Sequence, residues 1–317
     1  MTSNKKPKFK IVDTDKSTVT ESKVLDYIKS LVIPPAYDNV TIFYIPKPKI
    51  LFQGYDDKGR LQQIYSKEHK KKASMKKFCS LLYFGKVLPK IKNDINKYMK
   101  SDKLTQDKII SIILSIIMHC GFRVGNIKYQ KLYNSFGISN IIKDHIKFVD
   151  NSIIIKFVGK KGVINECNIN DAELIRELIT LTHNKKNKDY VFTYPNNGID
   201  TIITALDINK WLKQYHVDTT SKHFRTWDVN VLFIQYMRDS DDDHTKLTLN
   251  KRKKHVIESM KLISEQVNNT PAICKKEYLN NDLLDLYINK PQQFKKSFCG
   301  CRDARNCFLD YLEKICN

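Results

Sequence analysis

One apolar segment in the middle of the chain constrains the fold more than any other feature. Between Thr105 and Cys120 the sequence is apolar around almost the whole helical turn, with six isoleucines and one leucine from Ile109 to Ile117. A helix that is hydrophobic on all sides must be buried, and Gly121 can end it. The lipid-like run Ile109–Met118 is far shorter than the ~20 residues of a membrane span. We therefore expect a buried central helix in a soluble helical domain.

Upstream of this helix the sequence has strand texture. The runs Val40–Ile45, Lys49–Gly54 and Arg60–Tyr65 are rich in β-branched and aromatic residues, and Asp56–Gly59 supplies a turn between the last two. From about Val87 the apolar residues recur at helical spacing, with Pro89 expected near the start of that helix. These changes predict a flexible arm over residues 1–20, a small β-rich domain over 21–76 and a mainly helical domain over 77–317.

One β island interrupts the helical domain. The runs 145–149, 153–158 and 163–169 predict a three-stranded meander, and its second turn, Gly159–Gly162, carries Lys160 at the tip. Helices are expected to resume at about Asp171 and to continue to the C-terminus. The predicted fold class is α+β: a small β-rich N-terminal domain and a larger, mainly α-helical domain with an inserted β-meander.

The charge balance points to an anionic partner. The chain has 55 Lys and Arg against 34 Asp and Glu, a net charge of +21, and its lysines gather in blocks such as Lys67–Lys77 and Lys251–His255. Such blocks are typical of segments that face phosphates or link two lobes. The alternative is a lysine-rich composition that only decorates solvated helix faces. The acidic run Asp239–Asp243 is expected to be solvated.

The eight cysteines show no repeated Cys-x-x-Cys spacing, and the N-terminus lacks the apolar stretch of a signal peptide. We therefore expect free thiols in a reducing, intracellular compartment. A metal site built from Cys299, Cys301 and Cys307 is the alternative, but no second pair with matching spacing supports it. Phosphate-binding glycine loops and zinc-spaced sets are also missing, so no nucleotide cofactor and no metal are predicted.

Four basic or polar segments remain as candidates for chemistry. Arg123 lies between two glycines directly after the buried helix, and Lys160 lies at the hairpin tip. Thr220 or Ser221 can cap a helix that carries Lys222 and Arg225 in its first turns. The fourth segment contains Asn269-Thr270-Pro271 and then a tyrosine, Tyr278.

This order of residues resembles the type IB DNA topoisomerases, in particular the compact poxvirus-type and bacterial branch. The front of the chain is similar to the DNA-clamping β domain of that family in three places: Ile33–Tyr37, Gln53-Gly54 with Asp57–Arg60, and Gln62–Tyr65. The resemblance covers most of the chain beyond the arm. It implies the catalytic fold that these topoisomerases share with tyrosine recombinases, and the composition is typical of a large DNA virus with an AT-rich genome.

The resemblance also implies residue roles. Tyr278 would be the nucleophile, Arg123 and Arg225 would bind the scissile phosphate, Lys160 would be the general acid, and Lys222 would support the site. Asn269 stands where poxvirus enzymes carry His, so an amide would donate a hydrogen bond there without acting as acid or base. The expected DNA-binding residues are Arg60, Gln62, Tyr65, Lys128, Tyr129, Lys275 and Lys276.

The implied activity is relaxation of supercoiled DNA through a 3′-phosphotyrosyl intermediate, without ATP or metal. The chain would clamp double-stranded DNA as a monomer and, if viral, act in the virion and at host-cell sites of viral DNA. A tyrosine recombinase is one alternative, although such enzymes usually carry His-x-x-Arg where this chain has Lys222-x-x-Arg225. A basic DNA-binding protein without catalytic activity is the other.

Overall fold

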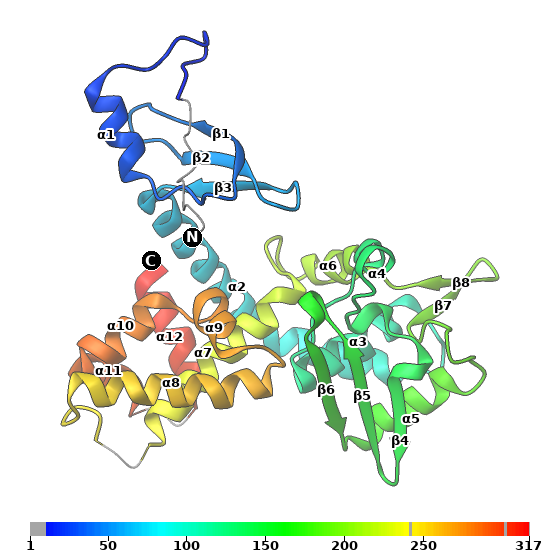
Figure 1. Ribbon diagram of the computed structural model, residues 1–317. Helices are drawn as coiled ribbons and strands as arrows, with labels where there is room; N and C mark the ends of the chain where they lie inside the picture. The colour runs from blue at the N-terminus through cyan, green and yellow to red at the C-terminus, as the bar shows by residue number, and fades with distance from the viewer. Residues whose placement is uncertain (1–10, 241–242, 301–302, 317) are drawn as a thin grey trace, which may run out of the picture. The chain divides into compact units, whose positions relative to one another are not determined.

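The computed structural model describes residues 11–240, 243–300 and 303–316. The chain divides into two compact units, Met1–Lys77 and Phe78–Asn317. The fold combines many helices with small antiparallel sheets, and the first unit is a small region of strands (Figure 1). No helix among the described residues is long and apolar enough to cross a bilayer.

The first unit contains a helix and one sheet. Helix α1 (Ser22–Ser30) was not predicted; it precedes the antiparallel strands β1 (Asp38–Ile42), β2 (Ile50–Tyr55) and β3 (Leu61–Tyr65), which pair in the order β1-β2-β3. The expected turn between β2 and β3 is present, and Gly59 adopts φ +66° there, a conformation that glycine reaches without strain.

Helix α2 (Lys67–Met99) is much longer than the sequence predicted. The basic block at 67–77 forms its first turns, so Pro89 lies in the interior and the expectation that it lies near the start of its helix was wrong. An interior proline costs about 3 kcal/mol in helix stability. Leu88, Ile91 and Ile95 are buried around it, and each fully buried side chain contributes about 1.5–3 kcal/mol. Packing therefore outweighs the local penalty.

The predicted central helix is confirmed. Helix α3 (Gln106–Cys120) is capped by the Thr105 hydroxyl, which accepts from the Lys108 amide, and it ends at Gly121 with φ +64°. The end of α3 is tightly packed: a Cβ on Gly121 would lie 2.5 Å from the Cα of Val267. Any larger residue would push apart the two segments that carry Arg123 and Asn269.

The β island is confirmed as strands β4 (Ile146–Val149), β5 (Ser152–Val158) and β6 (Ile164–Ile169) in one antiparallel sheet, with a 3₁₀ turn at Lys160–Gly162. The expectation that only helices follow was wrong. After α5 (Ala172–Thr182) comes a hairpin of β7 (Thr193–Asn196) and β8 (Ile199–Ile202), whose two turn residues have positive φ.

Helices make up the rest of the second unit. A short helix, α4 (Ile127–Tyr133), precedes the meander. After the β7–β8 hairpin come α6 (Ala205–Lys213), α7 (Ser221–Arg238), α8 (Leu249–Gln266), α9 (Pro271–Ile273), a π-helical segment Cys274–Tyr278, α10 (Asn281–Asn289), α11 (Pro291–Phe298) and α12 (Ala304–Cys316).

The expectation of free thiols was wrong for most described cysteines. Disulfides join Cys79 to Cys316 and Cys120 to Cys167, and Cys307 is also disulfide-bonded. Cys274 and Cys299 are free thiols, whereas Cys301 lies outside the described residues. The paired cysteines are 237 and 47 residues apart in the sequence. They meet because the fold places α12 near α2 and β6 near α3.

The acidic run was expected to be solvated, and its two described aspartates form surface ion pairs. Asp239 contacts Arg238 at 2.7 Å and Asp243 contacts Lys295 at 3.3 Å; residues 241 and 242 lie outside the described part. Among the described residues, no cluster of three or more His, Cys, Asp or Glu side chains could hold a metal ion.

Candidate active site

Arg225 lies at the centre of a cluster of polar side chains in the second unit. It occupies the second turn of α7, which begins after Thr220 as the sequence predicted, and only 6% of its surface is exposed. Its Nε donates to the carbonyl oxygen of Gly121 at 2.9 Å, and its Nη1 donates to the Tyr278 hydroxyl at 2.7 Å. Two directed bonds thus fix the guanidinium plane against the tyrosine.

Tyr278 is the last residue of the π-helical segment and is 5% exposed. Burial alone would raise the pKa of its phenol. The positive charges of Arg225 and Arg123, together with their hydrogen bonds, outweigh burial and lower the pKa below its usual value. The Arg225 Cζ also lies 5.4 Å from the ring centroid, and the Lys222 Nζ lies 5.9 Å from it. The surroundings of Tyr278 therefore make its phenolate form easier to reach than that of an ordinary tyrosine.

The backbone of Tyr278 is held by a side chain that sequence reasoning missed. Asn230 is fully buried on α7, and its Nδ2 donates to the Tyr278 carbonyl oxygen at 2.9 Å. Its Oδ1 accepts from the Asn280 amide at 2.8 Å. Because Asn230 binds the chain on both sides of Leu279, it fixes the position from which the Tyr278 side chain projects.

Arg123 and Asn269 are brought together as a pair. The Arg123 Nη2 donates to the Asn269 Oδ1 at 3.0 Å, and the Thr270 amide donates to the same oxygen at 3.1 Å. The Nδ2 of Asn269 is buried and has no hydrogen-bond partner among the described residues. A buried amide donor of this kind costs free energy unless another acceptor binds it, and a phosphate oxygen is such an acceptor.

The two candidate lysines differ in position. Lys222 is solvent-exposed at the start of α7, beside the tyrosine ring. Lys160 is exposed at the tip between β5 and β6, where Lys161 and Gly162 have φ of +64° and +76°. Within the described part of the chain, no hydrogen bond or ion pair joins Lys160 to Arg225 or Tyr278. The structure therefore clusters all the proposed catalytic side chains except Lys160.

An acidic residue close to the cluster was also missed. Asp228 lies one helical turn after Arg225, and burial raises the pKa of its carboxyl to about 7 although Lys92, Arg305 and Arg225 all favour its charged form. Because burial favours the neutral acid, Asp228 compensates the Arg225 charge less than an ordinary carboxylate would.

The expected DNA-binding residues occupy separate surfaces. In the first unit, the Asp56 carboxylate accepts from the Arg60 Nε and from the Gln62 Nε2, both at 2.9 Å. The Tyr65 hydroxyl donates to the Gln63 Oε1 at 2.8 Å, so Tyr65 is on the opposite face of β3 from Gln62. In the second unit the expected residues are all exposed: Lys128, Tyr129, Lys275 and Lys276.

Comparisons with known proteins agree with this arrangement. A family model described as the catalytic core of eukaryotic DNA topoisomerase I matches residues 66–302, and one for the N-terminal domain of bacterial DNA topoisomerase IB matches residues 8–56. DNA topoisomerase 1B of Acanthamoeba polyphaga mimivirus is 29% identical over 292 residues, covering 88% of this chain and 84% of that protein. DNA topoisomerase 1B of Vaccinia virus (strain Copenhagen) is 25% identical over 243 residues, covering 76% and 74%. Because the catalytic-core model matches most of the length of this chain, the chain belongs to the DNA topoisomerase I family.

Proposed function

We propose that this chain is a type IB DNA topoisomerase that relaxes supercoiled duplex DNA by cutting and resealing one strand, with Tyr278 as the nucleophile. The observation that carries the proposal is the 2.7 Å hydrogen bond from Arg225 to the Tyr278 hydroxyl, inside a cluster that also contains Arg123. Family membership and the relatives named above support the same activity.

The first step is attack of the Tyr278 oxygen on a backbone phosphorus. An ordinary phenol has a pKa of ~10, so its ionisation at pH 7 costs about 4 kcal/mol; the two arginines reduce this cost. The new P–O bond to tyrosine forms as the bond to the 5′-oxygen breaks. The products are a 3′-phosphotyrosine and a free 5′-hydroxyl, and the energy of the phosphodiester is conserved in the new ester.

Charge that builds on the phosphate oxygens during attack needs fixed donors. Arg123 and Arg225 supply guanidinium groups, which stay protonated and donate in parallel pairs. The unpaired Nδ2 of Asn269 supplies a neutral donor. These groups do the work that other phosphoryl-transfer enzymes assign to metal ions, so the proposal includes neither metal nor nucleotide.

The leaving 5′-oxygen needs a proton, because an unassisted alkoxide is a poor leaving group. We assign this proton to the Lys160 ammonium at the hairpin tip, with the β5–β6 hairpin bending toward bound DNA. Religation is the reverse: the 5′-hydroxyl returns its proton and attacks the phosphotyrosine. Rotation of the free end between the two steps releases supercoils.

The proposed substrate is double-stranded DNA bound by a monomer. The net charge of +21 and the exposed lysines support binding dominated by phosphate contacts, which weakens as salt rises. We assign the catalytic fold of the second unit to the class shared with tyrosine recombinases. The residues proposed to face DNA lie in both units: Arg60, Gln62 and Tyr65 in the first, and Lys128, Tyr129, Lys275 and Lys276 in the second.

The substitution Tyr278→Phe tests this proposal. It removes only the hydroxyl, so we expect duplex binding to persist while plasmid relaxation and the covalent protein–DNA adduct both disappear. Relaxation is measured on a plasmid without any special site, in the presence of EDTA. Retained relaxation by the variant would refute the nucleophile, and wild-type activity confined to one DNA site would favour a recombinase.

A further inference from the structure

The Cys120–Cys167 disulfide joins two parts of the proposed active site. Cys120 is the last residue of α3, directly before the Gly121 carbonyl that holds Arg225. Cys167 lies in β6, the strand that leads away from the Lys160 turn. The bond therefore ties the segment that positions the arginines to the hairpin that carries the proposed general acid.

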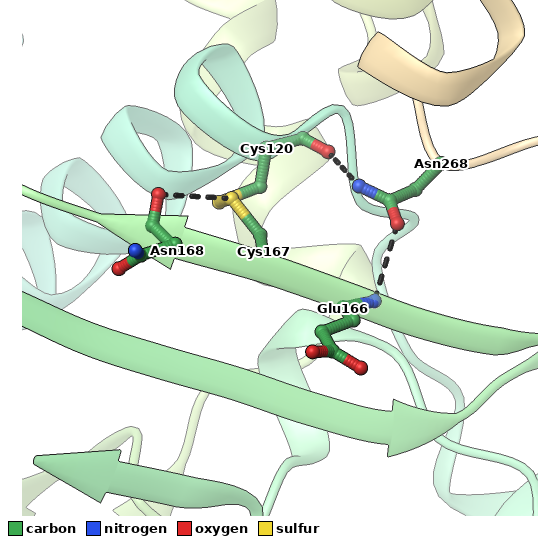
Figure 2. The surroundings of a disulfide bond; sticks show 5 residues. All are labelled: Cys120, Glu166, Cys167, Asn168 and Asn268. Carbon is green, nitrogen blue, oxygen red and sulfur yellow. Dashed lines mark hydrogen bonds between the residues drawn. A yellow bond between two sulfur atoms is a disulfide. The ribbon is translucent and has the colours of Figure 1, made fainter. Parts of the chain in front are cut away.

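A hydrogen-bonded side chain reinforces this connection (Figure 2). The Asn268 Nδ2 donates to the Cys120 carbonyl oxygen at 2.7 Å, and the Asn268 Oδ1 accepts from the Glu166 amide at 3.2 Å. Asn268 is the neighbour of Asn269. Three segments, namely the end of α3, β6 and the loop before α9, thus meet beside the disulfide.

The disulfide acts within the hairpin, where Cys167 pairs with Ile155 of β5. Cys167 is three residues along β6 from Ile164, which corresponds to about 10 Å, and Lys160 lies beyond that end of the strand. Other contacts hold β5, the strand before the Lys160 turn: Phe122 and Phe157 lie 4.9 Å apart between ring centroids, Ile153 and Ile155 are buried in the core, and the Phe136 amide donates to the Val158 carbonyl oxygen at 2.8 Å. The disulfide and Asn268 hold β6, the strand after the turn. Without the covalent bond β6 can shift against α3, and the turn that joins the two strands shifts with it, which moves Lys160.

We propose that the Cys120–Cys167 disulfide, together with Asn268, positions the Lys160 hairpin for the acid step, so that strand cleavage depends on the redox state of this pair. This inference rests on the proposed function. Both cysteines line a cavity of about 700 Å³, so a small dithiol can reach the bond. The dithiol gives up two electrons and two protons and becomes a cyclic disulfide, while Cys120 and Cys167 become thiols.

The test compares two double variants in the full chain. The variant Cys120→Ser/Cys167→Ser removes this disulfide, and Cys79→Ser/Cys316→Ser removes the one between α2 and α12 as a matched control. Single-turnover cleavage is measured on ordinary duplex DNA and on DNA with sulfur in place of the bridging 5′-oxygen. A thiolate leaves without a proton, because its pKa is far below that of an alcohol.

We expect the Cys120/Cys167 variant to cleave ordinary DNA on the order of a hundredfold more slowly, because misplacing a catalytic group by about 1 Å costs that much, and to cleave the sulfur-containing DNA at the wild-type rate. Dithiothreitol should slow the wild-type protein to the same level without slowing this variant further. Trypsin should cut at Lys160 or Lys161 faster in the variant than in the control. The Cys79/Cys316 variant should behave as wild type on both substrates.

Three results would overturn the inference: equal rates on ordinary DNA, an equal loss on both substrates, or free thiols at Cys120 and Cys167 in protein isolated without reductant. The equal loss would mean that the disulfide supports the fold or the tyrosine and not the acid step. Failure of the proposed function has a different signature, because the wild-type protein would then form no covalent adduct with either DNA.

Discussion

Asn230 offers the sharpest test of how the site is positioned, because it touches the backbone of the proposed nucleophile, Tyr278, and none of the reacting atoms. The substitution Asn230→Ala removes a donor to the Tyr278 carbonyl and an acceptor from the Asn280 amide. It also removes a bond to the Thr226 carbonyl at 2.7 Å. The change should therefore reduce both the stability of the protein and the rate of cleavage.

The structure sets the size of the stability loss. Thr226 keeps its place in the regular hydrogen bonding of α7, so two buried backbone groups lose their partners. Each unsatisfied buried group costs about 1–3 kcal/mol, and solvent that enters the space left by the amide recovers part of this. We expect the free energy of unfolding to fall by about 2–4 kcal/mol. Cleavage should fall by on the order of a hundredfold, because a shift of about 1 Å in the proposed nucleophile costs that much.

Urea unfolding and single-turnover cleavage of duplex DNA measure the two effects. The control is Leu178→Ala on α5: Leu178 is fully buried, and such a truncation costs about 2–5 kcal/mol without touching the cluster. We expect the control to lose similar stability but to cleave at the wild-type rate at temperatures where it is folded. If Asn230→Ala loses stability and still cleaves normally, the positioning argument is refuted.

Three further predictions concern charged side chains, two at the candidate active site and one in the first unit. Arg225→Ala should slow cleavage by about 10²–10³-fold, and Arg225→Lys should recover only part, because an ammonium cannot reproduce the two directed bonds; equal rates for Lys and Arg would contradict this. Since the pKa of Tyr278 is lowered, the cleavage rate should rise with pH and level off below pH 10. Arg123→Ala should move this rise to higher pH. An unmoved pH profile would exclude a role for Arg123 in the ionisation of Tyr278. Asp56→Ala should release the side chains of Arg60 and Gln62, which Asp56 binds in the first unit. The preference for cleavage sites, mapped on mixed-sequence DNA, should then change while cleavage by Tyr278 persists. An unchanged site map would argue against Arg60 and Gln62 as DNA contacts.

The parts of the fold that the sequence predicted are those decided locally. The run at 109–118, apolar except for two serines, left no position for α3 except the core, and the lysines between glycines at 159–162 marked the turn of the meander. The β7–β8 hairpin was missed although Asn197-Gly198 is a strong turn signal. Proline is disfavoured inside strands, so Pro195 weakens the strand signal before that turn. Pro89 predicted a helix start nearby, whereas α2 continues through it, because buried residues on both sides of Pro89 stabilise one long helix.

Side chains that depend on distant contacts could not be predicted. The disulfides join cysteines that are far apart in the sequence, and no spacing pattern announces them. Asn230 looks like an ordinary helix residue until α7 is placed against the π-helical segment. A signal was nevertheless available: Asn230 is five residues after Arg225, on a helix whose neighbouring positions are apolar, and a buried amide on such a helix must bind something.

A single helix, α7, explains most of the geometry around the proposed nucleophile. Lys222, Arg225 and Asn230 contact the ring, the hydroxyl and the carbonyl of one tyrosine. Tyr278 itself lies on an irregular turn, in which the Leu279 amide donates to the carbonyl of Cys274 five residues earlier; such π-helical turns are rare and concentrate at functional sites. An α-helical turn would rotate the tyrosine side chain by about 100° about the axis, away from Arg225. The regular helix α7 therefore holds Lys222 and Arg225 beside the tyrosine, and the irregular π-helical turn directs the Tyr278 hydroxyl toward Arg225.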